Sequence, residues 1–206
     1  MNSATREDLE EILTLYHANQ LEDRPQDVGN GIWKPTPLPI LFGEAVVLDT
    51  LYAKERKEHK GQVLVAGAGD GRRAAFLNRL GYDVFAVELN PNIVQHGNYV
   101  LHLLIEKNLV DGRRVKIVPG DFLDDNLYHE HGTSFEDFEK IFAYLRKCNL
   151  DALVTKVERQ SPKGVELFAL RHVNWENPKT GLQHKGSAVI SVPSHTNYSV
   201  DRYVKN

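Results

Sequence analysis

Cysteine is nearly absent from this sequence of 206 residues: Cys148 is the only one, so no internal disulfide can form. The sequence also lacks a long apolar run and the charge and apolar pattern of a signal peptide. Its nine histidines are scattered, and the nearest approach to a metal-binding tract, residues 128–131, is expected to be a solvated loop. We therefore expect a cytoplasmic protein with no membrane span and no metal site.

Basic side chains are missing from residues 121–139, a stretch that contains seven acidic residues and no Lys or Arg. A solubilising loop is the usual meaning of such a run. Attraction of a cationic substrate is the alternative, because the stretch follows a predicted strand. The whole chain has a formal net charge of only −3, which does not favour nucleic acid or a membrane surface as a partner. Its 41% hydrophobic and 26% charged residues are typical of a soluble globular protein.

A glycine-rich unit occupies residues 62–92. It consists of an apolar run that predicts a strand, a turn with Gly67, Gly69 and Gly71, a short helix and a second strand that ends at Glu88. Glycine has no Cβ, so a ligand can approach the backbone of the turn closely, and the helix directs free N–H groups towards it. Glu88 follows the first glycine by about 20 residues, where an acidic side chain accepts hydrogen bonds from ribose hydroxyls. The unit therefore predicts a nucleoside-binding site.

The spacing and charge of the turn distinguish between two classes of cofactor. The third glycine of a dinucleotide fingerprint comes later than Gly71, and here Asp70 lies inside the turn. A carboxylate at this point repels a pyrophosphate and suits a cationic or zwitterionic ligand. The turn looks like the S-adenosylmethionine site of the class I methyltransferases. The alternative is a glycine-rich turn that serves only as a chain reversal.

The hydrophobic periodicity of the remaining chain predicts an α/β fold: a Rossmann-like doubly wound, mostly parallel sheet with a final antiparallel strand. The turn between the last two predicted strands indicates that these two pair antiparallel at the end of the sheet. We expect helices from residue 3 to before residue 22 and at residues 41–57, 72–80, 91–108 and 150–157, and strands at residues 62–66, 82–88, 115–122, 140–145, 165–171 and 187–192.

The third predicted strand ends in Gly120, Asp121 and Phe122, which come to the carboxyl edge of the sheet beside the expected crevice. There Asp121 would accept a hydrogen bond from the adenine amino group and Phe122 would cover the adenine ring. A turn acid and a core aromatic are the alternative interpretation.

Several segments together resemble one group of enzymes: the archaeal protein-lysine methyltransferases, their relatives that modify ATP synthase c-subunits and, more remotely, the histone methyltransferases without a SET domain. The resemblance spans residues 33–178, and the matching segments are Trp33-Lys34-Pro35-Thr36-Pro37, Gly69-Asp70-Gly71-Arg72, Ile141-Phe142-Ala143-Tyr144-Leu145, Pro162-Lys163-Gly164 and Trp175-Glu176-Asn177-Pro178.

The resemblance implies a methyltransferase that uses S-adenosyl-L-methionine, releases S-adenosyl-L-homocysteine and modifies a protein at lysine. It divides the chain into an N-terminal helical segment with a proline-rich cofactor lid at residues 1–60 and a single cofactor-binding domain at residues 61–206. Tyr144 is expected to line the methyl-transfer channel as the catalytic residue. The expected cofactor contacts are Trp33, Pro35, Thr36, Ala66, Gly67, Ala68, Gly69, Asp70, Gly71, Glu88, Leu89, Gly120, Asp121, Phe122 and Ala143.

The sequence departs from the family pattern at three points. The acidic segment at residues 124–139 is longer than the family's connection. Trp33 and Lys34 replace a Tyr and a small apolar residue, and Tyr144 and Arg146 stand where the family has an Asn or Asp motif that grips the target nitrogen. The acceptor therefore stays open between a protein, a small molecule and a nucleic acid. A cofactor-binding scaffold without catalysis is a further alternative, whereas a nicotinamide-dependent oxidoreductase disagrees with the glycine spacing and with Asp70.

Overall fold

The structure is a computed structural model. It describes residues 3–19, 26–27, 32–33, 40–41, 43, 46–47, 61–172, 178, 180–191 and 197–206.

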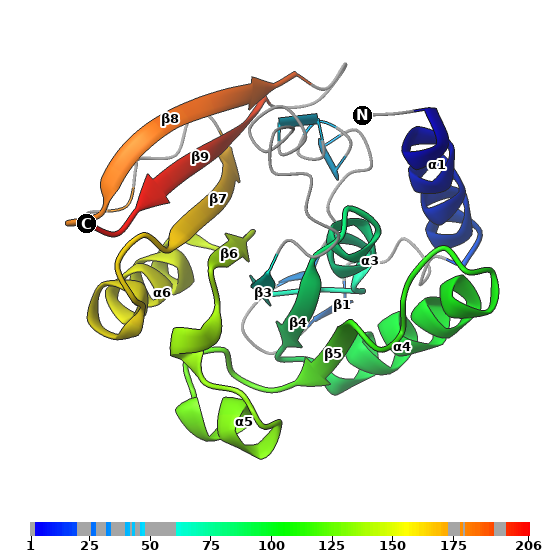
Figure 1. The fold of residues 1–206 in the computed structure, drawn as a ribbon, viewed down its shortest axis with the longest axis horizontal. Helices are drawn as coiled ribbons and strands as arrows, with labels where there is room; N and C mark the ends of the chain where they lie inside the picture. The colour runs from blue at the N-terminus through cyan, green and yellow to red at the C-terminus, as the bar shows by residue number, and fades with distance from the viewer. Residues whose placement is uncertain are drawn as a thin grey trace.

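A seven-stranded sheet forms the centre of the molecule (Figure 1). Across the sheet the strands follow the order β5 (Val115–Pro119), β4 (Asp83–Glu88), β3 (Gln62–Ala66), β6 (Lys140–Ala143), β7 (Glu166–His172), β9 (Tyr198–Val204) and β8 (Gln183–Ile190). The strands from β5 to β7 are parallel to their neighbours, and β9 is antiparallel to both β7 and β8. The predicted fold class is confirmed.

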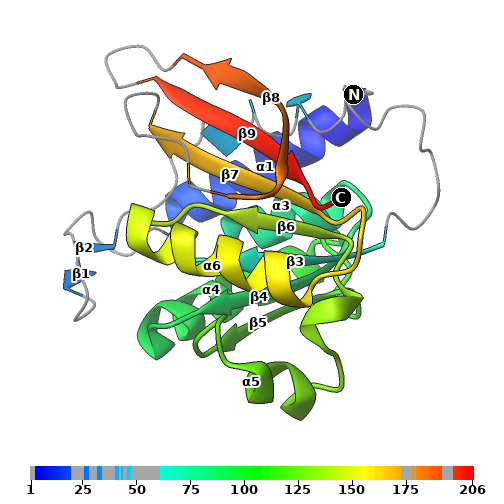
Figure 2. The same ribbon diagram turned by 90° about the vertical axis from the view of Figure 1, so that its left-hand side faces the viewer.

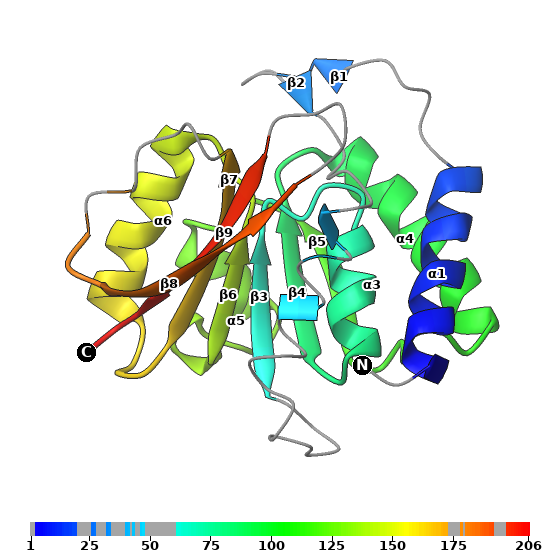
Figure 3. The same ribbon diagram turned by 90° about the horizontal axis from the view of Figure 1, so that it is seen from above.

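Helices cover both faces of this sheet (Figures 2 and 3). We call the face under α1 (Ser3–Ala18), α3 (Arg72–Arg79) and α4 (Pro91–Glu106) the α3 face, and the face under α5 (Asp125–Glu130) and α6 (Lys147–Gln160) the α6 face. Strands buried on both faces send alternate side chains to each. On the α3 face these are Val63, Val65, Val84, Ala86, Val115, Ile117, Phe142, Phe168 and Leu170. On the α6 face they are Leu64, Ala66, Phe85, Val87, Val118, Ile141, Ala143, Leu167 and Ala169.

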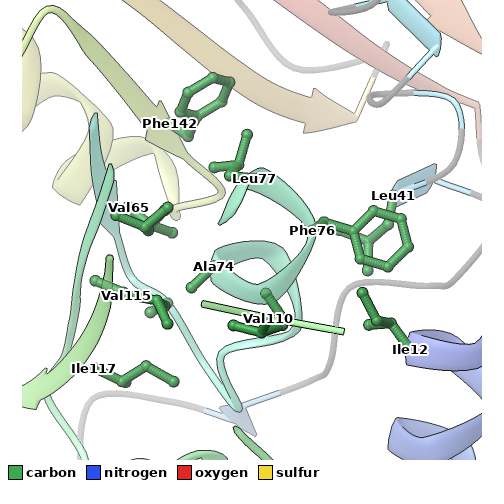
Figure 4. Close-up of a cluster of buried hydrophobic side chains, with 14 of the residues drawn as sticks. Ile12, Leu41, Val65, Ala74, Phe76, Leu77, Val110, Val115, Ile117 and Phe142 are labelled. Atoms are coloured by element: carbon green, nitrogen blue, oxygen red, sulfur yellow. The ribbon is translucent and has the colours of Figure 1, made fainter. Parts of the chain in front are cut away.

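The N-terminal helix α1 belongs to the same core as the sheet. Ile12 is fully buried in the cluster on the α3 face that Figure 4 shows in close-up. Two ion pairs at the surface join α1 to its neighbours: Asp8 pairs with Arg79 of α3, and Glu11 accepts from Lys107 after α4 at 2.9 Å. The predicted amphipathic helix is confirmed, and its apolar face packs on α3 and α4.

Helix α4 begins where the sequence predicts. The side-chain oxygen of Asn90 accepts from the backbone N–H groups of Asn92, at 2.9 Å, and Ile93, at 3.4 Å. Pro91 occupies the first helical position, where its missing N–H costs nothing. This cap fixes the chain direction directly after the strand that carries Glu88.

The expectation of a solubilising loop at residues 121–139, and of a solvated loop at 128–131 within it, is wrong about the loop, although the seven acids are exposed. This stretch contains the helix α5 and a short 3₁₀ helix, η1 (Phe135–Asp137). Tyr128 and Phe135 are buried on the α6 face, so the segment has an apolar side that the charge pattern concealed. The acids support the local structure: the Asp124 carboxylate caps α5 by accepting from Asn126 N–H at 3.0 Å, and Asp125 pairs with a lysine of α6.

The predicted pairing at the end of the sheet is also wrong. Strand β9 lies between β7 and β8, so the last two predicted strands do not touch each other. Val200 of β9 is opposite Leu170 on one side and Ala188 on the other. Strand β9 buries side chains on both faces and needs a central position, whereas the largely exposed β8 suits an edge. The alternation of residues 198–204 was the available signal for this strand.

Other element boundaries differ by a few residues. Helix α6 is longer than the predicted 150–157, since it begins at Lys147 and ends at Gln160. The predicted helix at residues 41–57 falls largely outside the described residues, of which Leu41, Gly43, Val46 and Val47 are helical. None of the described helices has the length and apolarity needed to cross a membrane.

Candidate active site

The strand order creates one position where a crevice is expected. From β3 the chain proceeds through β4 to β5 on one side, and then returns to place β6 and β7 on the other side of β3. Helical connections therefore diverge between the carboxyl ends of β3 and β6, which is where doubly wound sheets bind ligands. The glycine-rich turn follows β3, and Tyr144 follows β6, so both predicted motifs meet at this point.

Left-handed backbone conformations explain the glycines of the turn. Gly67, Gly69 and Gly71 have φ values of 71°, 58° and 79°. A Cβ on Gly67 would also lie 2.6 Å from the Cδ2 atom of Leu145, and one on Gly71 would collide with Ile117. The backbone favours glycine at all three positions, and a Cβ on Gly67 or Gly71 would also force a neighbouring side chain to move.

Hydrogen bonds to the next strand hold the turn in place. The N–H groups of Gly67 and Ala68 donate to the Val87 carbonyl at 3.0 and 2.9 Å. The Gly69 N–H donates to Oε2 of Glu88 at 2.9 Å, and the Asn90 N–H donates to Oε1 of the same carboxylate at 3.1 Å. Each carboxylate oxygen has a further lone pair, so Glu88 fixes the turn and can still accept two more hydrogen bonds.

Asp70 is buried and its charge is balanced within the turn. Its Oδ1 accepts from the backbone N–H of Arg72 at 3.3 Å and from Nε of the same residue at 2.9 Å. The expectation of a cationic ligand requires an unbalanced negative charge in the turn. Asp70 does not provide one, because Arg72 balances its charge. A two-residue spacing at the start of α3 lets the guanidinium fold back onto the acid. The role of Asp70 as a cofactor contact stays a prediction.

The carboxyl end of β5 joins the same edge. Gly120 donates to the Glu88 carbonyl at 3.0 Å, and the exposed Asp121 accepts from the Leu123 N–H at 2.9 Å. Phe122 lies in the core of the α6 face, and its carbonyl accepts from the Tyr128 hydroxyl at 2.6 Å. This position favours the interpretation of Phe122 as a core aromatic.

Exposed apolar side chains follow two adjacent strands at this edge. Leu89, directly after β4, is 56% exposed, and Leu123, four residues after β5, is 38% exposed. Leu89 was among the predicted contacts, whereas Leu123 was missed because it lies inside the acidic run. Their apolar surfaces suit the faces of a flat ring.

Small residues end β3 and β6 side by side. Ala66 is opposite Ala143 in the parallel ladder, and both are buried on the α6 face. Ala68 is buried on the α3 face. All three alanines therefore belong to the core beside the turn, and their roles as cofactor contacts stay predictions.

Tyr144 lies directly after β6, half-buried on the α3 face. Its ring centroid is 6.2 Å from that of Tyr198, in an edge-to-face arrangement. Burial raises the pKa of Tyr144, and Tyr198 raises it further through its charge and a side-chain hydrogen bond. Tyr144 is therefore a neutral phenol at physiological pH and cannot act there as a phenolate base.

No family model and no curated protein matches this sequence. Solved structures do match its fold. A putative O-methyltransferase from Klebsiella pneumoniae is 14% identical, with 97% of this chain and 90% of that chain covered and a TM-score of 0.63. An RNA methyltransferase from Salinibacter ruber, in complex with S-adenosyl-L-homocysteine, is 16% identical, covering 84% and 95%, with a TM-score of 0.58. Magnesium protoporphyrin IX methyltransferase from Synechocystis, with bound S-adenosylmethionine, is 10% identical, covering 96% and 97%, with a TM-score of 0.58.

The chain has the fold of the class I methyltransferases. Within this methyltransferase fold, the backbone of Trp33 belongs to β2 (Ile32–Trp33), which pairs antiparallel with β1 (Gln26–Asp27). Figure 3 shows this pair of strands beyond the carboxyl ends of the parallel strands, where a lid is expected. Pro35 and Thr36 lie outside the described residues.

The methyltransferase fold also brings Tyr16 of α1 to the glycine-rich turn, which sequence reasoning missed. The Arg72 guanidinium carbon lies 5.6 Å from the Tyr16 ring centroid, and the hydroxyl lies 3.6 Å from a Cβ placed on Gly71. Burial raises the pKa of Tyr16 well above its usual value, with a further contribution from the charge of Asp70. In sequence, Tyr16 is one more apolar position of an amphipathic helix, so no local signal distinguishes it.

Proposed function

We propose that this protein is an S-adenosylmethionine-dependent methyltransferase. The observation that carries the proposal is the hydrogen-bonded unit of the glycine-rich turn and Glu88 at the switch point of the sheet. A ribose-bearing ligand needs an acceptor for its two hydroxyls and a backbone that it can approach closely. Glu88 offers the acceptor, and the turn at Gly67 and Gly69 offers the backbone.

The other groups at this edge fit the rest of the cofactor. Leu89 and Leu123 offer apolar surface for the adenine faces, and Asp121 offers an exposed carboxylate for its amino group. The methionine part would lie along the backbone of Gly67 and Gly69, where the balanced charge of Asp70 leaves hydrogen bonding as the main attraction. The lid prediction for Trp33, Pro35 and Thr36 is part of this proposal.

S-adenosylmethionine, when bound, supplies a methyl group on a sulfonium for in-line displacement. The chain's own contribution is to align the acceptor with that methyl group and to exclude water. Ala66 and Ala143 keep the floor of the crevice close to the backbone, and Tyr144 offers a neutral hydroxyl beside the acceptor. We propose lysine of a protein as the acceptor, as the sequence resemblance implies; the lysine must arrive as the neutral amine.

Calorimetric titration with S-adenosylhomocysteine tests the cofactor. We expect saturable binding by the wild type and a loss of at least about tenfold in affinity for Glu88→Ala, because hydrogen bonds to a charged group contribute about 1.5–3 kcal/mol each. Glu106→Ala is the control, since its side chain is 61% exposed on the distal end of α4 and far along the chain from the turn. Absence of saturable binding, or equal affinity for Glu88→Ala, contradicts the proposal.

A second candidate acceptor is an anionic molecule such as RNA. Arg146 and Lys147 follow Tyr144 closely and are exposed, and positive charge disfavours a lysine ammonium while it favours phosphate. Incubation of the protein with cell extract and cofactor labelled in the methyl group separates the candidates. Label in protein bands supports lysine, label in RNA or metabolites supports the second candidate, and tight cofactor binding without transfer to any fraction supports a non-catalytic scaffold.

A further inference from the structure

We propose that Tyr198, in the C-terminal strand, is a positioning residue that holds the hydroxyl of Tyr144 at the methyl-transfer end of the crevice. The inference rests on the proposed methyltransferase function, because it concerns the acceptor side of the same site. It links that site to the last ten residues of the chain, which carry no cofactor motif.

The backbone of Tyr144 lies against the glycine-rich turn, which is the proposed cofactor site. The Tyr144 carbonyl oxygen lies 3.7 Å from a Cβ placed on Gly67, so the end of β6 packs directly against the glycine-rich turn. Its ring lies on the α3 face, where it joins the edge of the apolar cluster. Tyr144 therefore joins the glycine-rich turn through its backbone and the core of the α3 face through its side chain.

Tyr198 is held more firmly than a loop residue could be. It is the first residue of β9, and it is opposite His172 of β7 on one side and Ile190 of β8 on the other. The side chain is only 7% exposed. Its edge-to-face contact therefore links the ring of Tyr144 to two strand pairs. A side-chain hydrogen bond with Tyr198 also contributes to the raised pKa of Tyr144.

A third group acts on the same hydroxyl. Arg73, in the first turn of α3, is buried, and its positive charge acts on Tyr144. A phenol has one donor and two acceptor positions, so Tyr144 can engage Tyr198 and still present a hydrogen-bonding position to an acceptor. Tyr144 and Tyr198 would then replace the Asn or Asp motif that the sequence lacks, with orientation supplied by neutral hydroxyls.

Conservative variants test this role. Tyr198→Phe keeps the ring and removes the hydroxyl, and Tyr203→Phe is a matched control because Tyr203 lies on the same strand but packs on the α6 face. The readouts are the initial rate of methyl transfer from labelled cofactor into the extract fraction that the wild type labels, and the affinity for S-adenosylhomocysteine. We expect Tyr198→Phe to lower the transfer rate about three- to tenfold at unchanged affinity, and the control to match the wild type.

A double-variant comparison separates positioning from a general structural effect. We expect Tyr144→Phe to lower the rate at least as much as Tyr198→Phe, and the double variant to equal Tyr144→Phe alone, because Tyr198 acts only through Tyr144. NMR of proteins labelled at the tyrosine ring adds a readout that needs no acceptor: the Tyr144 ring signals should shift in Tyr198→Phe and keep their wild-type positions in Tyr203→Phe. Wild-type rates for Tyr198→Phe, or additive losses in the double variant, overturn the inference alone. Failure of the wild type to bind S-adenosylhomocysteine overturns the proposed function itself.

Discussion

Glu88 combines a structural role with the proposed ribose-binding role in one buried side chain. Its two oxygens accept from the backbone of the glycine-rich turn and of the α4 cap, so the carboxylate is oriented before any ligand arrives. A pre-oriented acceptor loses less entropy on binding than a free side chain would. Asp70 has the opposite arrangement, since Arg72 balances its charge inside the turn.

Gly67 provides a residue-scale prediction about stability. Gly67→Ala combines a left-handed backbone with a collision against Leu145, whereas Gly164→Ala has a similar φ of 86° in open space. Backbone strain alone costs about 1–2 kcal/mol per residue, and overpacking typically adds about 1–3 kcal/mol. Urea unfolding should therefore show a clearly larger loss for Gly67→Ala than for Gly164→Ala. Equal losses would contradict the close packing of the Leu145 side chain against Gly67.

Helix α5 is the element whose character the charge pattern concealed. Its apolar side chains Leu127 and Tyr128 are buried, while Asp125 at its start contacts the buried Lys156 of α6 at 2.6 Å and accepts from Gln160 at 2.8 Å. The acids of this segment thus serve as caps and as partners of α6. Helix α5 has only six residues, and its two buried side chains are too few for a helical periodicity to stand out among the seven acids.

The contact between α5 and α6 gives an element-scale prediction about pH. The hydrogen bond from Lys156 lowers the pKa of Asp125 in the folded state, so this pair stabilises the protein above the usual pKa of an aspartate and loses its effect as pH falls through the lowered value. Asp125→Asn should lower the urea midpoint at pH 7 by the equivalent of at most about 1 kcal/mol, because Asp125 is half exposed. The difference from wild type should shrink as the pH falls below the usual pKa of an aspartate.

Glu130→Gln is the matched control for this titration, since Glu130 is an exposed acid of the same helix. We expect its unfolding midpoint to follow the wild type from pH 7 to pH 3. A gap between Asp125→Asn and the wild type that stays constant as the pH falls well below the usual pKa of an aspartate would show that the ion pair contributes nothing to the pH dependence.

At the scale of the whole molecule, the insertion of β9 between β7 and β8 places Tyr198 against Tyr144, which directly follows β6. Strand β9 supplies Tyr198 and Val200 to the α3 face and the buried Asp201, which pairs with Arg171 of β7, to the other face. The same core receives α1 from the beginning of the chain. Helix α1, before the glycine-rich unit in the sequence, and β9, after it, therefore pack in the same core as that unit.

The strand order predicts a strong contrast between two valines. Val200 is 3% exposed in the central strand β9, whereas Val189 is 61% exposed in the edge strand β8. Val200→Asp buries an unpaired charge and should cost several kcal/mol, enough to prevent folding at moderate temperature. Val189→Asp should change the stability by about 0.5 kcal/mol or less. Thermal unfolding measures both, and similar melting temperatures would contradict the order of these strands.

Local patterns in the sequence were sufficient for the glycine-rich turn, Glu88, the cap at Asn90 and the alternation of the parallel strands. Each depends on backbone geometry or on neighbours within a few residues, so the residue types alone determine it. The tertiary structure decided the place of β9, the helix within the acidic run, and the meeting of Tyr16 with the turn and of Tyr198 with Tyr144. The two tyrosine contacts join residues more than 50 positions apart, and β9 and the helix in the acidic run find their places through contacts beyond their own segments. All of them form because burial of apolar surface on both faces of the sheet leaves each element only one place to pack.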